Sequence, residues 1–334
     1  MAGIADVAAA ARVTVGTVSR VLNGDPTVRV RPDTRERIYA AAREVDYTPN
    51  YAARALRRSR VGVIGLAVHD VTNPVYAAII SGAQRAVAHE GYLLMLADVQ
   101  ELARDKSSFS RIARSGLIDG LLLLPAGDDA DDELAATVSG IVPTVIVNDS
   151  SAQLSSVTVD NTAGMRMATE HLIAQGHRSI GYLALDGDTE RSRSRTDGWR
   201  IALQDAGLPV RAEWMIEAGH TAETGEIAAR EVLALPERPS AVVVASVMAA
   251  TGVLAACREQ GLRLPQDLSV IAFNDVFFAA QLDPALTVVT SPLAEMGSAS
   301  VELLLRLLSG GEAEHLIVRD PPPALILRGS TTAP

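Results

Sequence analysis

The 334-residue sequence has few of the features that disulfide-rich, membrane or metal-binding proteins require. Its one cysteine, Cys257, cannot form an internal disulfide, and the segment GVLAACREQ around it predicts a buried helical position. No apolar run approaches the roughly 20 residues that cross a bilayer. Asp6 and Arg12 interrupt the alanine-rich start, which has no basic leader and is a poor signal peptide. We therefore expect a cytoplasmic protein with no membrane contact.

Catalytic signatures are also missing from the sequence. It contains no GxxxxGK[ST], GxGxxG, HExxH or GxSxG segment, and its histidines are too scattered to suggest metal-ligand spacing. The acidic residues Asp128, Asp129, Asp131 and Asp132 indicate a solvated loop and a helix start, because acids stabilise helix N-termini. We expect no enzyme, no metal site and no cofactor. An enzyme and a stand-alone small-molecule binding protein remain as alternatives.

Charge is distributed unevenly along the chain. Residues 1–60 contain eleven arginines and six acidic residues, which gives this segment a net charge of +5. Because the whole chain has a net charge of −10, residues 61–334 must carry −15. A basic segment on an acidic body is typical of a nucleic-acid-binding module attached to another domain. Lys106 is the only lysine in the chain, so nearly all basic residues are arginines, and this composition bias explains part of the arginine content of residues 1–60. A chance split of charge is the alternative to a nucleic-acid-binding module.

The first 48 residues show the periodicity of three short helices. Thr14 is a good N-cap for the second helix, over residues 15–22, and Pro32 is a preorganised first-turn residue for the third. The apolar positions are Ile4, Val7, Ala8 and Ala11 in the first helix, Val18, Val21 and Leu22 in the second, and Ile38, Ala41, Ala42 and Val45 in the third. Two helices joined by a tight turn and braced by a third predict a helix-turn-helix unit.

From residue 61 onward, short apolar runs alternate with helical segments. The runs cover residues 61–68, 92–98, 120–125 and 143–149, and then 179–185, 240–246 and 268–275. Continuous apolar strands that alternate with helices indicate parallel sheets covered on both faces. Two such series predict an α/β core of two Rossmann-like subdomains, with ligands bound beyond the carboxyl ends of the strands.

Two segments carry a close family resemblance. IADVAAAARVTVGTVSRVLNG, followed by TRERIYAAAREVDYTPNYAARALR, resembles the DNA-binding head and hinge of the LacI/GalR family of bacterial transcriptional regulators. Arg12 occupies the position of the usual turn glycine, and Gly3 replaces a hydroxyl-bearing cap. The resemblance implies a helix-turn-helix head over residues 1–48, a hinge helix over 49–60 and a core of periplasmic-binding-protein type over 61–334. Its N-subdomain would span about 61–159 and 290–318, and its C-subdomain about 160–289 and 319–334, with crossings near Val159, Thr290 and Val318.

The resemblance and the helix geometry together predict the DNA contacts. Arg20 has the fork geometry that reads a guanine, Val15 could contact a thymine methyl group, and Leu56 would be the apolar wedge in the minor groove. The predicted DNA-binding residues are Thr14, Val15, Gly16, Thr17, Ser19, Arg20, Asn23, Asn50, Ala53, Arg54, Leu56 and Arg57. The alternatives are that Val15 merely packs at the helix start and that residues 49–60 are a basic linker.

The resemblance also predicts a small-molecule effector site between the subdomains. Its predicted residues are Asn73, Tyr76, Asn148, Arg195, His220, Ser246, Asn274, Asp275 and Ser291. Family members that bind neutral sugars commonly have aspartates at the positions of Asn148 and Asn274, so the amides remove negative charge opposite Arg195. This difference favours a sugar acid or a polyol. The alternative is that Asp275 restores the acceptor and that the effector is a neutral sugar.

These patterns combine into one functional hypothesis. The sequence predicts a ligand-responsive transcriptional regulator, most simply a repressor, that binds double-stranded operator DNA. Because one head reads only a few base pairs, two heads related by a twofold axis would read a pseudo-palindromic operator, and we expect a homodimer.

Overall fold

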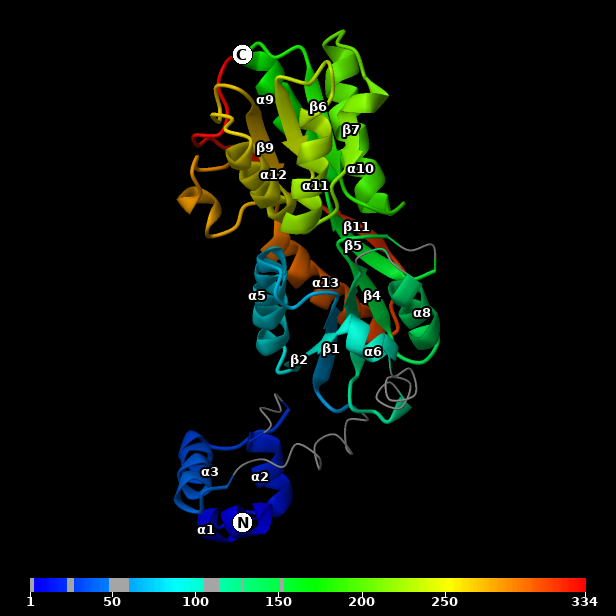
Figure 1. Cartoon of the computed structure of the whole chain (residues 1–334). Coiled ribbons are helices and arrows are strands. Elements are labelled where there is room, and N and C mark those ends of the chain that lie inside the picture. Colours follow the sequence, from blue (N-terminus) through cyan, green and yellow to red (C-terminus); the bar gives the residue numbers. More distant parts are fainter. Residues whose placement is uncertain are drawn as a thin grey trace. The chain divides into compact units, whose positions relative to one another are not determined.

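The computed structural model describes residues 3–22, 27–47, 60–104, 114–125, 127, 129–150 and 153–334. The chain forms two compact units, Met1–Val61 and Gly62–Pro334, which we call the head and the core (Figure 1).

The head contains the three expected helices, α1 (Ile4–Ala11), α2 (Val15–Leu22) and α3 (Pro32–Glu44). Their apolar stripes meet in a small buried cluster built around Val7, Val18, Val21 and Ile38, each with no exposed surface. Arg12 ends α1 with φ 52°, in the left-handed region that normally favours glycine. This backbone geometry explains why a glycine would suit the turn that Arg12 occupies.

The core consists of two subdomains, each with a six-stranded sheet. The first sheet has the order β11-β5-β4-β3-β1-β2, and its paired strands are all parallel. The elements of this N-subdomain are β1 (Val63–Val68), α5 (Pro74–His89), β2 (Leu93–Asp98), α6 (Val99–Arg104), β3 (Gly120–Leu124), α8 (Asp129–Val138), β4 (Thr144–Val147), β5 (Ser155–Val159), α13 (Leu293–Leu308) and β11 (His315–Val318). Strands β3, β4 and β5 are buried throughout, as expected of a sheet covered on both faces.

The C-subdomain repeats this arrangement. Its sheet has the order β12-β10-β9-β8-β6-β7, with β12 antiparallel to β10. Its elements are α9 (Asn161–Ala174), β6 (Ile180–Ala184), α10 (Glu190–Asp205), η1 (Ala212–Trp214), β7 (Met215–Glu217), α11 (Ala222–Leu233), β8 (Ala241–Val244), α12 (Val247–Glu259), β9 (Ser269–Phe273), η2 (Ala279–Gln281), β10 (Thr287–Thr290) and β12 (Ala324–Ile326). The predicted fold class, a helix-turn-helix head followed by two parallel α/β subdomains, is confirmed.

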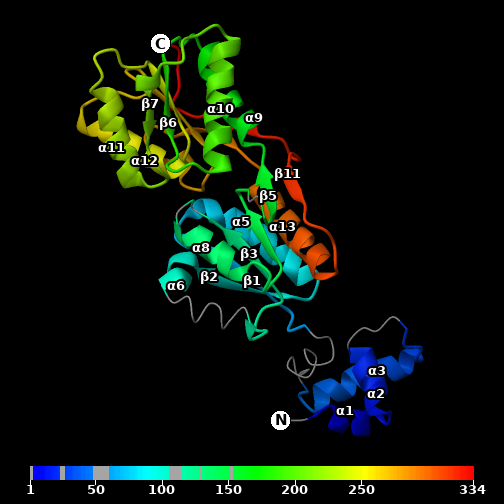
Figure 2. The same ribbon diagram turned by 90° about the vertical axis from the view of Figure 1, so that its right-hand side faces the viewer.

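Three segments of the chain connect the subdomains. The chain crosses after β5, again between β10 and α13, and a third time between β11 and β12. Strands β5 and β11 pair in parallel and lie side by side where they leave the N-subdomain (Figure 2). The Nε atom of Arg319 donates to Oδ2 of Asp160 at 3.1 Å, so a salt bridge joins the first crossing to the third.

Glycines allow two helix pairs to pack backbone against backbone. A Cβ atom on Gly82 of α5 would lie 1.8 Å from the carbonyl oxygen of Ala294 in α13, and one on Gly297 would lie 2.1 Å from that of Ile79. The C-subdomain repeats this geometry between Gly225 of α11 and Gly252 of α12. No side chain larger than hydrogen fits at these crossings without moving a helix.

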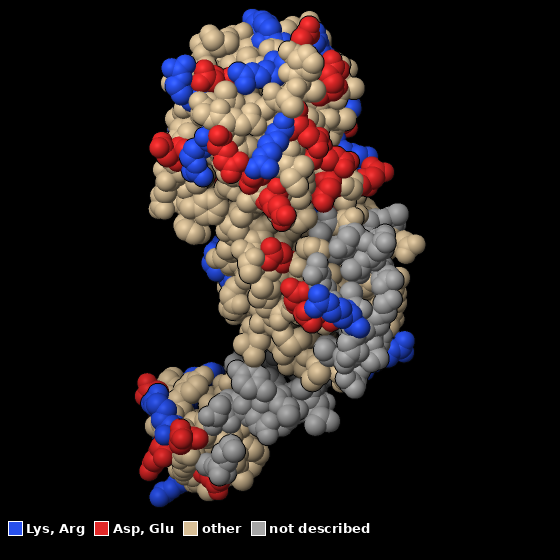
Figure 3. Space-filling view, in the orientation of Figure 1, with Lys and Arg blue, Asp and Glu red and all other residues tan. Residues whose placement is uncertain are grey.

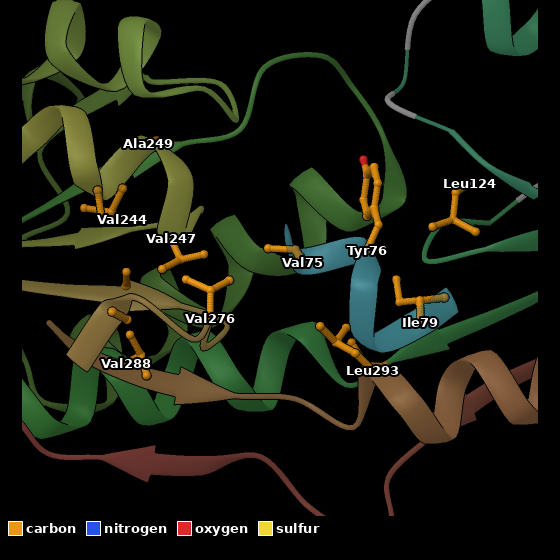
Figure 4. Close-up of a cluster of buried hydrophobic side chains, with 14 of the residues drawn as sticks. Val75, Tyr76, Ile79, Leu124, Val244, Val247, Ala249, Val276, Val288 and Leu293 are labelled. Carbon is orange, nitrogen blue, oxygen red and sulfur yellow. The ribbon is translucent and has the colours of Figure 1, made fainter. Parts of the chain in front are cut away.

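Apolar contacts continue from one subdomain to the other. Val75 and Tyr76, at the start of α5, belong to the same buried cluster as Val247 and Val276 of the C-subdomain. Figure 4 shows Val75 pointing toward the latter pair. Cys257 is buried in α12, as predicted, and burial raises the pKa of its thiol to about 11. Among the described helices, none combines the length and the hydropathy that a bilayer crossing demands.

Candidate functional site

The head presents a slim face at the start of α2. The backbone N–H of Thr17 donates to Oγ1 of Thr14 at 3.2 Å, which confirms the predicted N-cap. Val15 is 44% exposed, Gly16 and Arg20 are also exposed, and a Cβ on Gly16 would meet only Oγ1 of Thr14, at 4.0 Å. This face could approach a flat or grooved partner closely, with Arg20 as its one long donor.

Ser19, one of the predicted DNA contacts, is only 7% exposed and therefore does not belong to the exposed face of α2. It lies three residues before Leu22 and so borders the apolar side of this helix. The remaining predicted DNA contacts, Asn23, Asn50, Ala53, Arg54, Leu56 and Arg57, lie outside the described residues and stay predictions.

In the core, a cavity of about 40 Å³ lies between the subdomains. Seven of the nine predicted effector residues line it, namely Asn73, Tyr76, Asn148, Arg195, His220, Ser246 and Asn274. Val75, Leu185, Arg191 and Val247 complete the lining. Strand ends and helix starts from both subdomains supply these side chains, which is where ligands bind in open α/β sheets.

Asn148 and Asn274 occupy equivalent places in the two subdomains. Each follows a buried strand, β4 or β9, and each has a positive φ, 66° and 71° respectively. Asparagine tolerates this left-handed backbone better than most residues. Oδ1 of Asn148 is buried without a hydrogen-bond partner in the described structure, whereas Oδ1 of Asn274 accepts from the Ser291 hydroxyl at 2.5 Å.

Asp275 and Ser291 are the two predicted residues that do not line the cavity. The carboxylate of Asp275 accepts two bonds from Arg328, at 3.0 and 2.7 Å, and its Oδ1 also caps the N–H of Val276. Ser291 contacts Asn274 and therefore acts on the cavity through that amide. Asp275 is occupied elsewhere and does not restore a carboxylate to the cavity lining.

Arg195 is the most buried cation of the site, at 4% exposure. Its Nε donates to Oδ1 of Asn161 at 2.9 Å and its Nη1 to the carbonyl oxygen of Ala245 at 2.6 Å, while the guanidinium lies 4.3 Å from the centre of the Phe273 ring. Burial, together with the neighbouring charge of Arg191, lowers the pKa of Arg195 to about 9. The group is therefore still cationic at neutral pH.

Arg191 is a lining residue that the sequence argument missed. It is 8% exposed and extends from α10 of the C-subdomain to the N-subdomain, where Nη1 donates to the carbonyl oxygens of Asn148 at 3.3 Å and Pro125 at 3.4 Å. The signal was present in the sequence, because Arg191 and Arg195 are four residues apart and therefore share one face of α10. Arg193, between them, lies on the exposed side and pairs with Asp188.

Two histidines face each other at the margin of the cavity. The rings of His69 in the N-subdomain and His220 in the C-subdomain meet edge to face, with centroids 6.0 Å apart. Nδ1 of His220 lies 3.5 Å from Oδ1 of Asp186, and this hydrogen bond, followed by charge attraction, lowers the pKa of the Asp186 carboxyl. No cluster of three or more metal-ligating side chains occurs within the described ranges.

The face drawn in Figure 3 carries charged groups of both signs over the C-subdomain, and several acidic groups lie next to one another toward its lower right.

Comparison with known proteins places both units. Residues 3–50 match the model "Bacterial regulatory proteins, lacI family", and residues 169–331 match the "Periplasmic binding protein-like domain". The HTH-type transcriptional repressor CytR of Escherichia coli (strain K12) is 33% identical over 98% of this chain and 96% of its own.

Two solved structures resemble the chain over nearly its whole length. A complex of the transcriptional regulator CelR with cellobiose is 30% identical with a TM-score of 0.71, and it covers 99% of this chain and 100% of its own. The lac repressor dimer bound to operator and the anti-inducer ONPF is 27% identical with a TM-score of 0.78, and it covers 99% of each chain. The chain therefore belongs to the lacI family of bacterial regulatory proteins.

Proposed function

We propose that this protein is a transcriptional repressor whose binding to operator DNA is controlled by a sugar-like small molecule in the cavity of the core. One observation carries the proposal: a single chain joins the exposed, slender face of α2 to a cavity lined by buried polar side chains from two subdomains. The first part suits a major groove and the second suits a small polar ligand. The CytR relative is a repressor and the CelR structure contains cellobiose, which supports both halves of the proposal.

We propose that Thr14, Val15, Gly16, Thr17 and Arg20 form the described part of the DNA contact. Small residues let the helix backbone approach the bases, and the Arg20 guanidinium could bond O6 and N7 of a guanine. Such a protein acts by binding and not by catalysis, and it works in the cytoplasm, where operator DNA lies.

A homodimer on a pseudo-palindromic operator is part of the proposal. The edge strand β2 exposes Leu93 (56%), Leu96 (46%) and Met95 (37%), and Phe277 in the C-subdomain is 80% exposed. Exposed apolar edge strands are normally covered, and a second copy of the chain would cover this one. The lac repressor structure is a dimer on its operator, which supports the same arrangement here.

Selection of binding sites from a random duplex library tests the DNA half of the proposal. The full-length protein should enrich two half-sites related by a twofold axis, and its affinity for them should fall steeply as salt rises. Light scattering after size exclusion should give the mass of a dimer. Enrichment of no sequence, or a monomer bound to a single half-site, would refute this function.

A further inference from the structure

We infer that the Arg12 guanidinium binds a phosphate group of operator DNA at the rim of the groove that α2 enters, and that this contact adds affinity without reading the base sequence. The inference rests on the proposed function and adds to it a residue outside the predicted set of DNA contacts.

The turn between α1 and α2 is held by two backbone hydrogen bonds. The N–H of Arg12 donates to the carbonyl oxygen of Ala9 at 3.2 Å, and the N–H of Val13 donates to that of Ala8 at 3.0 Å. These are the two bonds of a Schellman motif, which requires a left-handed backbone at the position of Arg12. Val13 packs against the buried cluster of the head, so the turn cannot relax without moving an apolar side chain out of that cluster.

Helices of the core end in the same motif but with a different residue. The same pair of bonds closes α5, α9, α10, α12 and α13, and in each of these helices the left-handed residue is glycine, namely Gly91, Gly176, Gly207, Gly261 and Gly310. In the head, α3 ends in this way with Asp46, and aspartate is one of the few residues with a side chain that tolerates a positive φ. The long, cationic side chain of Arg12 is therefore the exception at this position, and it costs stability that glycine would not.

Within the described residues, the Arg12 side chain makes no contact that offsets this cost. It is exposed, and its guanidinium has no hydrogen bond or ion pair in the part of the chain that the structure describes. Residues that oppose the local preferences of a fold are found mainly at functional sites. An anion outside the chain is the partner that a free guanidinium binds most strongly.

Arg12 lies close to the exposed start of α2. It precedes Thr14, the N-cap of α2, by two residues, so the two Cα atoms lie within about 7 Å of each other. A recognition helix enters the major groove by its N-terminal residues, so the turn before it passes close to the sugar–phosphate backbone at the rim. Duplex DNA carries one negative charge per ~1.7 Å of its axis, so a long side chain in this turn can reach a phosphate. The head would then use Arg20 for the bases and Arg12 for the backbone.

A structural role for Arg12 is the alternative. A cation near the C-terminus of a helix interacts favourably with the helix dipole, and Arg12 stands at the C-terminus of α1. Arg12→Gly separates the two roles, because it removes the charge and relieves the left-handed backbone at once. A phosphate contact predicts weaker DNA binding by a head that is no less stable, whereas a capping role predicts a less stable head.

The salt dependence of binding to the selected operator tests the inference on the full-length protein. Each phosphate contact contributes about 0.9 to the slope of log affinity against log salt, so an Arg12→Gly dimer that loses two contacts should have a slope shallower by about 1.8. Extrapolated from equal affinity at 1 M salt, the variant should bind about 60-fold more weakly at 0.1 M salt. Arg12→Lys keeps the charge and should keep the slope. The sequence that Arg12→Gly selects should be unchanged, because phosphate contacts carry no base information.

Two matched variants control for the backbone and for the charge. Asp46→Gly makes the same change of backbone at the end of α3 and should not make the slope shallower. Arg37→Gln removes one positive charge from the exposed side of α3 and should change the slope by less than half as much as Arg12→Gly. Hydrogen exchange in the full-length protein measures the local stability of the head, and the amides of α1 and α2 should be at least as protected in Arg12→Gly as in the parent.

Three results would overturn the inference. The first is a slope for Arg12→Gly equal to that of the parent, or one for Arg12→Lys as shallow as that of Arg12→Gly. The second is selection of a different base at one position, which would make Arg12 a base contact, and the third is lower protection of α1, which would assign the capping role. Each of these leaves the proposed function standing if the parent selects an operator. Selection of no sequence by the parent would instead refute the function itself.

Discussion

Replacing Gly82 by alanine should destabilise the core through the crossing of α5 and α13. The new Cβ would start 1.8 Å from the Ala294 carbonyl oxygen, and an ordinary contact needs about 3.4 Å, so the helices must separate by about 1.5 Å. The obstructing atom belongs to the backbone, which places the overpacking cost near the upper end of its range, about 3 kcal/mol. The higher helix propensity of alanine returns about 1 kcal/mol. The expected net loss is about 2 kcal/mol, or about 5 °C in melting temperature for a domain of this size.

Urea unfolding followed by circular dichroism measures this loss. Ser81→Ala is the matched control, because this exposed neighbour contributes only a bond to Arg85 and should change stability by less than about 0.5 kcal/mol. Gly297→Ala should cost a similar amount, and the double variant should cost less than the sum, since one separation of the helices relieves both contacts. A Gly82→Ala protein as stable as the parent would refute the argument that the two backbones are in direct contact.

Three further predictions concern the head, pH and the C-terminal segment. Arg20→Ala should weaken binding to the selected operator by about 1–3 kcal/mol and relax the sequence preference at one base pair. The control Arg37→Ala, on the exposed side of α3, should leave the preferred sequence unchanged. If Arg20→Ala weakens binding equally to all sequences, Arg20 does not contact a base. Burial lowers the pKa of His177 in the folded protein, so the contribution of this residue to stability is complete above its unfolded pKa of about 6.5 and should decline as pH falls below that value. The midpoints of urea unfolding, measured between neutral and mildly acid pH, should show this decline. If the His177→Gln variant has the same pH dependence, His177 is not its cause. Arg328→Ala should cost about 2 kcal/mol through loss of its two bonds to Asp275, with a coupling energy of similar size in a double-mutant cycle; coupling below about 0.5 kcal/mol would contradict the ion pair.

The pattern of apolar residues in the sequence predicted the helices and strands that are themselves rich in apolar side chains. The helices of the head and six of the seven strands with continuous apolar sequence, including β1, β3 and β9, follow from burial alone, because in each of them one face or both must leave water. The seventh, β2, was predicted from its apolar sequence, although its side chains are largely exposed at the edge of the sheet. Strand β5 did not follow, since its sequence SSVTV places Ser155, Ser156 and Thr158 in fully buried positions that only tertiary hydrogen bonds satisfy. The hydroxyl of Ser155, for example, accepts from the N–H of Glu314, 159 residues away.

The lining residues of the cavity were predicted correctly where the family resemblance gave their positions in the chain. They were predicted wrongly or missed where the orientation of a side chain decides whether it faces the cavity. The resemblance named Arg195 and Asn274 by their place in the chain, and both line the cavity. Asp275 is adjacent to Asn274, yet the left-handed backbone at Asn274 turns the chain and Arg328 holds the carboxylate outside the lining. The four-residue spacing places Arg191 on the same face of α10 as Arg195, but the polar sequence ERSRSR has no apolar stripe to show that this face is buried.

The three crossings between the subdomains limit how the core can move. A single connection would let one subdomain swivel or twist freely on the other, but three covalent links side by side, two of them tied by Asp160 and Arg319, resist both twisting and sliding. The motion that remains is a hinge rotation of one subdomain against the other about a single axis. A ligand that binds in the cavity can then change the structure only by this rotation of one subdomain against the other. Because displacement in a rotation is proportional to the distance from its axis, a shift of about an ångström near the axis becomes larger at the far ends of the subdomains.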